Sequence, residues 1–365
     1  VNKDGLIETV AADVPRLNYN FIDGVVQPDP HLLLEPQRAN IYTYSEDLGQ
    51  GTTLTNTAVD ETSVVSPDGS LTGNKLTQTS GAFVRKTLTS LSGTYTWSFF
   101  AKKGDLRYLC ARTLFVQNGT TPSYSNNIID LDTKTIAYKG TSVTSVSIQQ
   151  YPNDWIKVEI IATDNATASG DFVDFFFTDS TSSTQSTGVA GNGYLWGVQF
   201  EEGSYTTSYI PTNGSAVTRT EDNAQIASGA EDIIGSQNEG TLFIDLEIPY
   251  DTTSSDYFQF CISDGATTDN RVLMNFRSGE AIFQVFSGGS SVGFCNTPVV
   301  KNTRIKVAAS YKTNEFILYK DGTLADTIDT SGVVDFTTQM ETIRYADFGN
   351  GLKFEAKVHQ TMFFK

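Results

Sequence analysis

The segment Thr94-Tyr95-Thr96-Trp97-Ser98-Phe99 alternates between hydroxyl-bearing and aromatic side chains. Successive side chains of a β-strand point to opposite faces of the sheet, so Tyr95, Trp97 and Phe99 share one face. The hydroxyl side chains then share the other face. This pattern predicts a strand that is half-buried, with one face in a hydrophobic core.

The same two-residue period recurs along the chain from about residue 80. Ile156, Val158 and Ile160 share one face of a second strand, and residues 172–177 carry apolar side chains on both faces, which predicts a strand covered on both sides. Turn sequences separate these runs: Pro67-Asp68-Gly69, Lys103-Gly104-Asp105, Asn118-Gly119 and Ala190-Gly191-Asn192-Gly193. Short strands at this spacing indicate a sandwich or jelly roll.

A second block of strands follows a polar stretch over residues 211–238. It begins with Leu242, Ile244, Leu246 and Ile248 on one face. Further strands are predicted over residues 257–262, 272–276, 282–286, 305–309, 316–319 and 354–359, with a tight hairpin turn at Asp321-Gly322. We therefore predict an all-β chain of two tandem antiparallel β-sandwich (jelly-roll) domains with an extended N-terminal leader.

The predicted domain bounds follow from these blocks. The leader spans residues 1–40, the first sandwich 41–215, the linker 216–238 and the second sandwich 239–365. The apolar Leu32-Leu33-Leu34 must be buried, and we expect it to pack along the first sandwich or against a neighbouring subunit. Because the chain opens abruptly at Val1, we expect it to be part of a longer protein.

Charge and composition exclude several classes of partner. The chain has 365 residues with 25 Lys and Arg against 42 Asp and Glu, a formal net charge of −17. This argues against nucleic acid and anionic membranes as partners, since phosphate contacts need a surplus of basic residues. No apolar run is long enough for membrane insertion.

The three cysteines, Cys110, Cys261 and Cys295, do not form a disulfide framework. Pairing of Cys261 with Cys295 stays open, but buried free thiols are the favoured interpretation. No Cys/His spacing indicates zinc.

Three phrases carry a family resemblance. They are Asn2-Lys3-Asp4-Gly5-Leu6-Ile7-Glu8 with residues 15–19, then His31–Asn40 with residues 44–47, and finally Leu195–Gly203 with Thr207–Thr212. Together they resemble a module of phage and prophage tail-fibre and other virion structural proteins, over about residues 1–215. The resemblance implies a sandwich similar to carbohydrate-binding modules. The second block resembles a laminin-G or concanavalin-A-like domain.

This resemblance implies a bacteriophage virion appendage: a tail or head fibre or a decoration protein, located on the extracellular particle. Its partners would be other virion proteins, further copies of itself (a trimer is one option) and host surface glycans. The alternative is a secreted bacterial carbohydrate-binding protein, accessory to polysaccharide degradation.

Enzymatic chemistry is not predicted. His31 lies in the leader and His359 on the outward face of a strand, and neither accompanies a nucleophile motif. Concanavalin-like glycosidases carry a strand with three carboxylates; here Asp245 and Glu247 supply two, but Phe243 occupies the first position. We expect Asp245 and Glu247 to be solvated and the chain not to be an enzyme.

Binding residues are predicted from exposure alone. The tryptophans Trp97, Trp155 and Trp196 are expected in the core, so the carbohydrate-binding candidates are the loop aromatics Tyr124 and Tyr257. No cofactor is predicted, although a structural calcium ion would suit loop carboxylates. The candidate metal ligands are Asp130, Asp132, Asp264 and Asp269.

Overall fold

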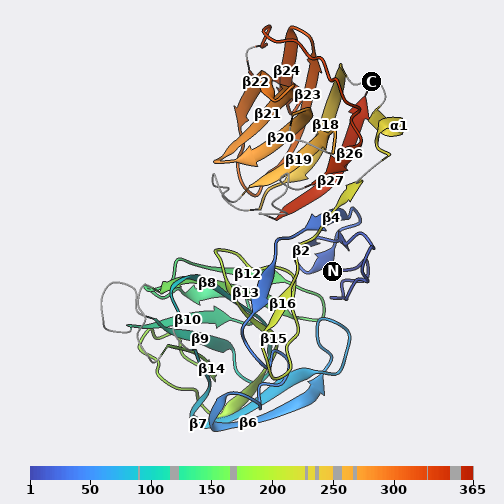
Figure 1. The fold of residues 1–365 in the computed structure, drawn as a ribbon. Helices are drawn as coiled ribbons and strands as arrows, with labels where there is room; N and C mark the ends of the chain where they lie inside the picture. Colours follow the sequence, from blue (N-terminus) through green and yellow to red (C-terminus); the bar gives the residue numbers. More distant parts are fainter. Residues whose placement is uncertain are drawn as a thin grey trace. The chain divides into compact units, whose positions relative to one another are not determined.

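The computed structural model describes residues 1–88, 91–115, 123–164, 171–226, 229–234, 238–249, 257–265, 269–326, 328–345 and 355–364. Within these ranges the chain is built of strands and one four-residue helix, α1 (Glu231–Ile234), which confirms the predicted all-β class. The chain divides into two compact units, visible in Figure 1. The first unit comprises Val1–Thr9, Tyr19–Asp29 and Arg38–Arg219, and the second comprises Val10–Asn18, Pro30–Gln37 and Thr220–Lys365.

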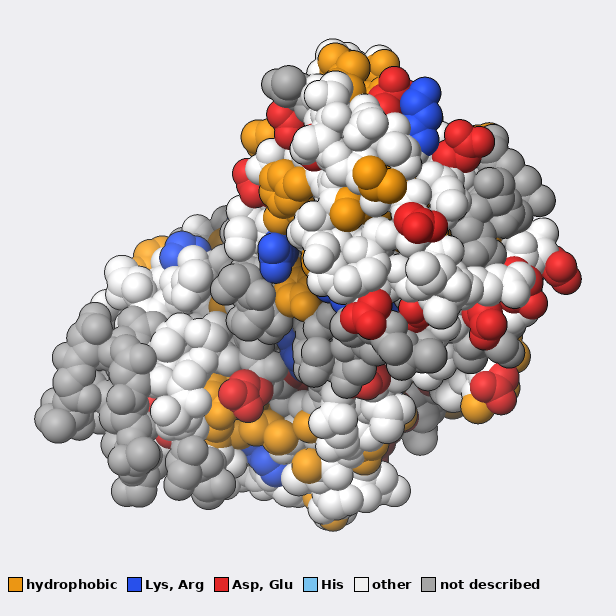
Figure 2. All heavy atoms as spheres, turned by 45° about the horizontal axis from the view of Figure 1, so that its top comes forward, with side chains coloured by type: hydrophobic (Ala, Val, Ile, Leu, Met, Phe, Trp, Pro, Cys, Tyr) orange, Lys and Arg blue, Asp and Glu red, His pale blue; other side chains and the backbone are white. Residues whose placement is uncertain are grey.

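The surface reflects the acidic composition. The face drawn in Figure 2 carries acidic side chains at many separate positions and few basic ones. Among the described residues, no helix has the length and apolar character needed to cross a bilayer.

The first unit is built on one antiparallel sheet of ten strands. Its order is β11-β10-β9-β14-β7-β15-β8-β13-β12, and β6 pairs with β7 beside this path. The bounds are β6 (Thr53–Val64), β7 (Gly73–Thr87), β8 (Gly93–Lys103), β9 (Tyr108–Phe115), β10 (Ser123–Asp130), β11 (Thr135–Tyr138), β12 (Ser145–Gln150), β13 (Ile156–Asp164), β14 (Phe172–Thr178) and β15 (Gly191–Glu202).

Strand β7 divides this sheet into two layers. Its residues 84–87 pair with β14, whereas residues 74–78 pair with β15. Strands β8 and β14 are not neighbours in the sheet, yet the ring centroids of Trp97 and Phe175 lie only 4.7 Å apart. The sheet therefore folds over itself into a sandwich (Figure 1).

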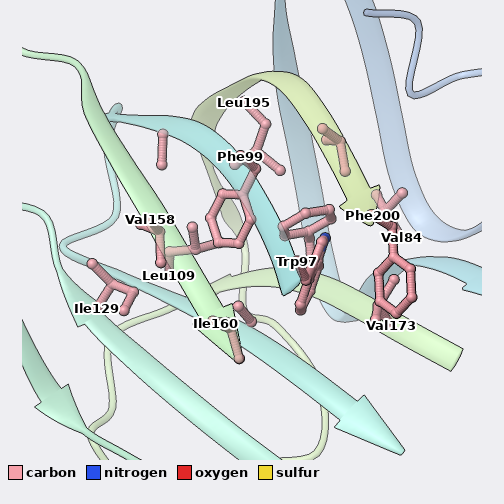
Figure 3. Packing of buried hydrophobic residues seen from close by; sticks show 14 of the residues in the cluster. Val84, Trp97, Phe99, Leu109, Ile129, Val158, Ile160, Val173, Leu195 and Phe200 are labelled. Carbon is pink, nitrogen blue, oxygen red and sulfur yellow. The ribbon is translucent and has the colours of Figure 1, made fainter. Parts of the chain in front are cut away.

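The core of the first unit lies between these layers. Figure 3 shows Trp97 and Phe99 of β8 beside Val158 and Ile160 of β13, the residues that the alternation assigned to the buried face. Trp155 and Trp196 are also buried, in a separate cluster with Phe100 and Tyr151. All three tryptophans therefore belong to the interior, as predicted.

Removing a ring from this core should leave a cavity. Phe175 is 1% exposed and contacts both Trp97 and Phe99, so we expect Phe175→Ala to lower the free energy of unfolding of the first unit by about 3–5 kcal/mol. Chemical denaturation followed by tryptophan fluorescence measures this loss. Leu71→Ala is the control, because Leu71 is 55% exposed and should change stability little. An equal loss in both variants would contradict the assigned core.

Smaller sheets complete the first unit. β2 (Phe21–Ile22) pairs with β3 (Val25–Val26), and β5 (Arg38–Asn40) pairs with β16 (Val217–Arg219). Asn40, at the end of β5, donates from Nδ2 to the carbonyl oxygens of Val198 and Ile210, at 3.2 and 2.9 Å. Its Oδ1 accepts the Phe200 N–H at 3.0 Å. One side chain thus joins β5 to two neighbouring segments that lie 158 and 170 residues further along the chain.

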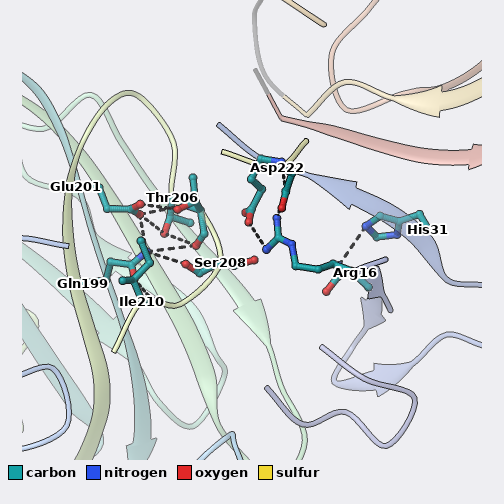
Figure 4. Close-up of polar contacts among 11 residues, drawn as sticks. Arg16, His31, Gln199, Glu201, Thr206, Ser208, Ile210 and Asp222 are labelled. Carbon is teal, nitrogen blue, oxygen red and sulfur yellow. Dashed lines mark hydrogen bonds and ion pairs between the residues drawn. The ribbon is translucent and has the colours of Figure 1, made fainter. Parts of the chain in front are cut away.

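Glu201 takes part in a second set of hydrogen bonds, which connects the end of β15 to residues 207–210 (Figure 4). Its carboxylate is fully buried and accepts hydrogen bonds from Gln199 Nε2 at 2.6 Å and from the Thr207 N–H at 3.0 Å. The Gln199 Oε1 accepts the Ile210 N–H at 2.6 Å. The phrases Leu195–Gly203 and Thr207–Thr212, which carry the family resemblance, therefore hold one another in place.

Neutralising Glu201 should loosen this tether. In Glu201→Gln the new amide NH₂ faces the Thr207 donors, so we expect a loss of about 1–3 kcal/mol in unfolding free energy. The neighbouring Glu202 is exposed, and Glu202→Gln is the matched control with little expected change. Thermal unfolding of the two variants makes the comparison, and equal melting temperatures would refute a tethering role.

The second unit is a sandwich of two antiparallel sheets. Their orders are β1-β4-β27-β18-β23-β24-β25 and β17-β26-β19-β20-β21-β22. The bounds are β1 (Leu17–Asn18), β4 (His31–Leu34), β17 (Gln225–Ile226), β18 (Gly240–Glu247), β19 (Phe258–Ser263), β20 (Arg271–Arg277), β21 (Glu280–Ser287), β22 (Ser290–Pro298), β23 (Arg304–Lys312), β24 (Glu315–Lys320), β25 (Thr323–Leu324), β26 (Thr342–Arg344) and β27 (Ala356–Phe364).

The alternation of apolar and polar side chains again identifies the residues that form the core of this unit. Leu242, Ile244 and Leu246 of β18 are fully buried, and so is Val307 of β23, which pairs with Ile244. Tight turns connect the strands, and residues with positive φ occupy these turns. Examples are Asp321, with a φ of 50°, and Gly322, with a φ of 80°. The predicted Asp-Gly hairpin is confirmed between β24 and β25.

The leader behaves differently from the prediction. β4 pairs with β27 in the second unit through Leu32 with Val358 and Leu34 with Ala356, so the expectation that Leu32-Leu33-Leu34 packs along the first sandwich or a neighbouring subunit is wrong. The physical reason is that β27 offers an unpaired edge, and β4 satisfies its backbone groups while burying leucines.

The observed unit bounds also differ from the expected ones. Residues 10–18 and 30–37 of the expected leader belong to the second unit, and that unit resumes at Thr220 rather than at residue 239. β16, β17 and α1 form within the expected linker. Cys110, Cys261 and Cys295 are buried free thiols, as favoured from the sequence.

Candidate functional site

A row of polar side chains crosses the outer face of the first unit's sheet. The register aligns Asn126 of β10, Arg112 of β9, Asp174 of β14 and Arg85 of β7 side by side. The alternation of β14 explains the row, because Val173 and the other residues on its side fill the core and turn Asp174 outward. The row is therefore a consequence of the core pattern.

One carboxylate in this row serves two guanidinium groups. Asp174 is fully buried and accepts two hydrogen bonds from Arg85, Nε to Oδ1 at 2.7 Å and Nη2 to Oδ2 at 2.8 Å. Arg112 donates from Nε to Asp174 Oδ2 at 3.0 Å and pairs with it through Nη2 as well. The three groups together carry a net charge of +1.

Aromatic rings surround these cations. The Arg85 Cζ lies 3.5 Å from the ring centroid of Phe172, and the Arg112 Cζ lies 5.1 Å from that of Tyr124. Tyr124 is 63% exposed, although its ring centroid stands only 5.9 Å from that of Phe172. A stable cation–π arrangement thus holds an exposed ring above a buried charge network.

The segment after β14 borders this face. Asn126 Nδ2 donates to the carbonyl oxygens of Ser183 and Gln185 at 2.9 and 2.6 Å, and Arg112 Nη1 donates to the Ser186 carbonyl at 2.7 Å. Arg85 Nη1, by contrast, donates to no group in the described parts of the chain, and the Arg85 side chain is 26% exposed. It is a donor available to a ligand.

This arrangement has a defined chemical capacity. An exposed phenol ring packs against apolar C–H surface and offers a hydroxyl at its edge. A guanidinium held in place by a carboxylate presents its remaining N–H groups in a fixed direction. The face of Tyr124 and Arg85 therefore suits a ligand with one C–H surface and several acceptor oxygens.

The other aromatic candidate lies elsewhere. Tyr257 belongs to the second unit, is partly buried and precedes β19. The neighbouring residues 252–256, from which its exposure was argued, lie outside the described residues. The structure therefore brings Tyr124, but not Tyr257, to the polar row.

The four aspartates expected to hold calcium make local contacts. Asp130 pairs with Arg107 Nη2 at 2.6 Å, and this guanidinium holds the pKa of Asp130 well below its usual range; Asp132 pairs with Lys103. In the second unit, Asp264 Oδ2 accepts the Thr338 hydroxyl at 2.9 Å, and the Asp269 carbonyl accepts the Gly289 N–H at 3.0 Å. No group of three or more His, Cys, Asp or Glu side chains suited to a metal ion occurs within the described ranges.

The carboxylates considered for glycoside cleavage are engaged in ion pairs. Asp245 is only 2% exposed and receives two hydrogen bonds from Arg304, at 2.7 and 2.9 Å, so the expectation that it is solvated is wrong. Arg304 on the paired strand β23 supplies the charge that permits its burial. Glu247 is also largely covered and pairs with Lys357 Nζ at 2.7 Å.

The two histidines of the chain meet in the second unit. The ring centroids of His31 and His359 lie 5.6 Å apart, and Asn18 Nδ2 lies 3.1 Å from His31 Nε2. His359 is half-buried here instead of facing solvent as expected. Burial lowers the pKa of His31 to about 3, helped by the nearby charges of Lys357 and His359.

This histidine should make the second unit sensitive to acid. The unfolded chain binds a proton at His31 near pH 6.5 and the folded unit only near pH 3, so folded stability falls as the pH drops through this window. We expect His31→Gln to remove up to about 2–3 kcal/mol of the stability lost between pH 7 and pH 4.5. Urea unfolding at both pH values tests this. His359→Gln should remove a smaller share, and an unchanged pH dependence in His31→Gln would contradict the assignment.

The sequence interpretation did not single out Arg85, Arg112 or Asp174. A signal was present, since Asp174 interrupts an otherwise apolar run over residues 172–177. A charge inside a strand covered on both sides requires a partner. Its two partners, however, come from β7 and β9, and their register with β14 is set by the fold.

Comparisons with known proteins give likenesses in structure alone. No family model matches the chain, and no curated protein matches it. Solved structures that resemble it include the carbohydrate binding module CBM66 from Bacillus subtilis, with 16% identity over 41% of this chain and 87% of that chain, at a TM-score of 0.28. The mouse laminin alpha1 chain, domains LG4-5, has 11% identity over 78% of this chain and 86% of that chain, at 0.27. A human galectin-16 variant has 9% identity over 36% of this chain and 90% of that chain, at 0.27. At these scores and identities the likenesses assign neither a function nor a site to this chain.

Proposed function

We propose that the chain is a non-catalytic glycan-binding protein, displayed on a phage virion, that holds sugar on the outer face of its first unit. The observation that carries the proposal is the exposed ring of Tyr124 over the Arg112–Asp174–Arg85 network. The ring stacks on the C–H face of a sugar, while Arg85 Nη1 donates to a sugar oxygen.

The network supports binding through preorganisation. Asp174 fixes the guanidinium of Arg85 with two hydrogen bonds, so little side-chain entropy is lost when a ligand arrives. Arginine keeps its charge at all physiological pH values, and the site therefore works without a proton transfer. The proposed role is recognition, and the face needs no acid or nucleophile.

The virion part of the proposal is supported by sequence. The phrases Asn2–Glu8, His31–Asn40 and Leu195–Gly203 resemble a module of virion structural proteins, and the proposed partners are other virion proteins and further copies of this chain. A shallow face binds a single sugar weakly, but several copies on one particle raise the overall affinity through effective concentration.

Substitution of the exposed ring tests the site. We expect Tyr124→Ala to weaken binding of the best ligand on a glycan array by at least about tenfold, because roughly 1.4 kcal/mol of ring contact is lost. Tyr319→Ala is the control, since Tyr319 is 42% exposed and lies in the second unit. Arg85→Gln should also weaken binding. Equal affinity of Tyr124→Ala and the unchanged chain would overturn the site, and no binding to any glycan would overturn the function.

The proposed location of the protein on the phage particle is tested in a separate experiment. Mass spectrometry of purified phage particles should detect the chain in a fixed copy number. Its absence from particles, together with its presence in a bacterial secretome beside polysaccharide-degrading enzymes, would favour the secreted bacterial alternative.

A further inference from the structure

The outer face of one sheet in the second unit carries a row of amide side chains. Strands β19 to β22 (Figure 1) align Gln259, Asn275, Ile282 and Asn296 side by side, one residue from each strand. On the opposite side of β20, Met274 is fully buried in the core. Because successive side chains of a strand alternate between the two faces, the burial of Met274 turns the neighbouring amide of Asn275 outward.

Two of these amides are coupled to one another but incompletely bonded. Gln259 Nε2 donates to Asn275 Oδ1 at 2.6 Å, and the two residues are only 6% and 5% exposed. The other ends, Gln259 Oε1 and Asn275 Nδ2, have no hydrogen-bond partner in the described parts of the chain, and neither atom is fully enclosed. Buried amides ordinarily use both ends. This pair therefore keeps one acceptor and one donor for a group that comes from solution.

Apolar side chains lie beside the amide pair on the same face. Leu273 is 3% exposed and Ile282 is 6% exposed, and each is a neighbour of Asn275 in the sheet. Phe294 of β22 aligns with Leu273 through Gln284, and its ring is 46% exposed. Adjacent strands are about 4.8 Å apart, so β20 and β22 are separated by about 10 Å. A ligand that reaches both Asn275 and Phe294 is therefore longer than one sugar ring.

The edge of this sheet at β22 is closed to a further strand. β22 is the last strand in the order, and two of its N–H groups are bonded to carboxylates outside the sheet. The Phe294 N–H donates to Asp329 Oδ2 at 3.2 Å. The Asn296 N–H donates to Asp326 Oδ2 at 2.9 Å. A peptide that joins a sheet as an extra strand needs such N–H groups for its own backbone. The face, and not this edge, is therefore the feature that suits a ligand.

We propose that this face is a second glycan site and that its ligand is a neutral oligosaccharide. A sugar hydroxyl both donates and accepts hydrogen bonds, so sugar hydroxyls match the free ends of Gln259 and Asn275. A neighbouring sugar ring places its C–H surface against Phe294. The row contains only uncharged side chains, and a neutral ligand loses less hydration energy there than a carboxylate or sulfate would.

This site goes beyond the function proposed for the first unit. The face of the first unit offers a guanidinium and a phenol ring, at Arg85 and Tyr124. The face of the second unit offers amides and the ring of Phe294. The two sites suit different glycans, and either one can exist without the other.

The experiment uses the full chain with Tyr124→Ala, so that the first site is weakened, and measures binding to an array of neutral oligosaccharides. Adding Phe294→Ala should lower the remaining affinity by at least about tenfold, because the ring contact is lost. Phe364→Ala is the matched control and should leave this affinity unchanged. Phe364 is the same type of residue, is 49% exposed and lies on β27, in the other sheet of the second unit.

Asn275→Asp tests the amide pair. The new carboxylate still accepts the hydrogen bond from Gln259 Nε2 but has no N–H for the ligand. The affinity for neutral oligosaccharides should therefore fall by about three- to tenfold. Thermal unfolding checks that this variant folds. Phe294→Ala changes an exposed residue and keeps the test decisive if Asn275→Asp does not fold.

Three results would overturn the second site. The first is equal affinity of the Phe294→Ala and Phe364→Ala chains. The second is the absence of neutral oligosaccharide binding by the unchanged chain. The third is complete loss of this binding in Tyr124→Ala alone, which would leave the site in the first unit standing. If Tyr124→Ala instead binds like the unchanged chain while Phe294→Ala weakens binding, the second site is supported and the first is wrong. The two sites therefore fail separately.

Discussion

The fold of the first unit depends on one constraint: strand β14 (Phe172–Thr178) is buried on both faces. Its inward residues, among them Phe175, meet the aromatic rings of β8 across the sandwich. Its outward residues must also be covered, and one of them is Asp174. A charge in that position is tolerated only with strong partners, so the packing of the core leads directly to the Arg85–Asp174–Arg112 network. The candidate binding face is thus the reverse side of the same strand that closes the core.

The sequence predicted correctly those features that depend on neighbouring residues, and it missed those that depend on contacts between residues distant in sequence. Alternation is local, so the buried faces of β8, β13 and β18 could be read directly. Tyr124 is exposed as predicted, but the expectation that it lies in a loop is wrong, because Tyr124 belongs to strand β10 and pairs with Leu114 of β9. Strand pairing is not local. His31–Leu34 pairs with β27, more than 300 residues away, and no property of the leader indicates that choice over another exposed edge. The same reason explains Asp245, which looks like a surface residue until β23 brings Arg304 beside it.

The phrases behind the family resemblance have a structural meaning. Asn40 uses its side chain to bind backbone groups more than 150 residues away, and Gln199 and Glu201 use theirs to bind backbone groups of the following segment, Thr207 and Ile210. Residues with such duties tolerate few replacements, because an unsatisfied buried group costs more than the lost bond itself. These phrases therefore describe how the first unit closes. The candidate binding face consists of other residues: Tyr124, Arg85, Arg112 and Asp174.

The two units respond differently to pH, because they contain different titratable groups. The candidate binding face contains arginines, which stay protonated, and Asp174, which accepts hydrogen bonds from two guanidinium groups. The N–H donors of these arginines are the same in neutral and in mildly acidic solution. The second unit contains His31, whose folded state resists protonation, and therefore loses stability over the same interval. A surplus of acidic residues, with a net charge of −17, does not alter this contrast, because exposed charges are screened within about 10 Å at ordinary ionic strength. Acid should therefore weaken the second unit over an interval in which the arginines of the candidate face keep their charge.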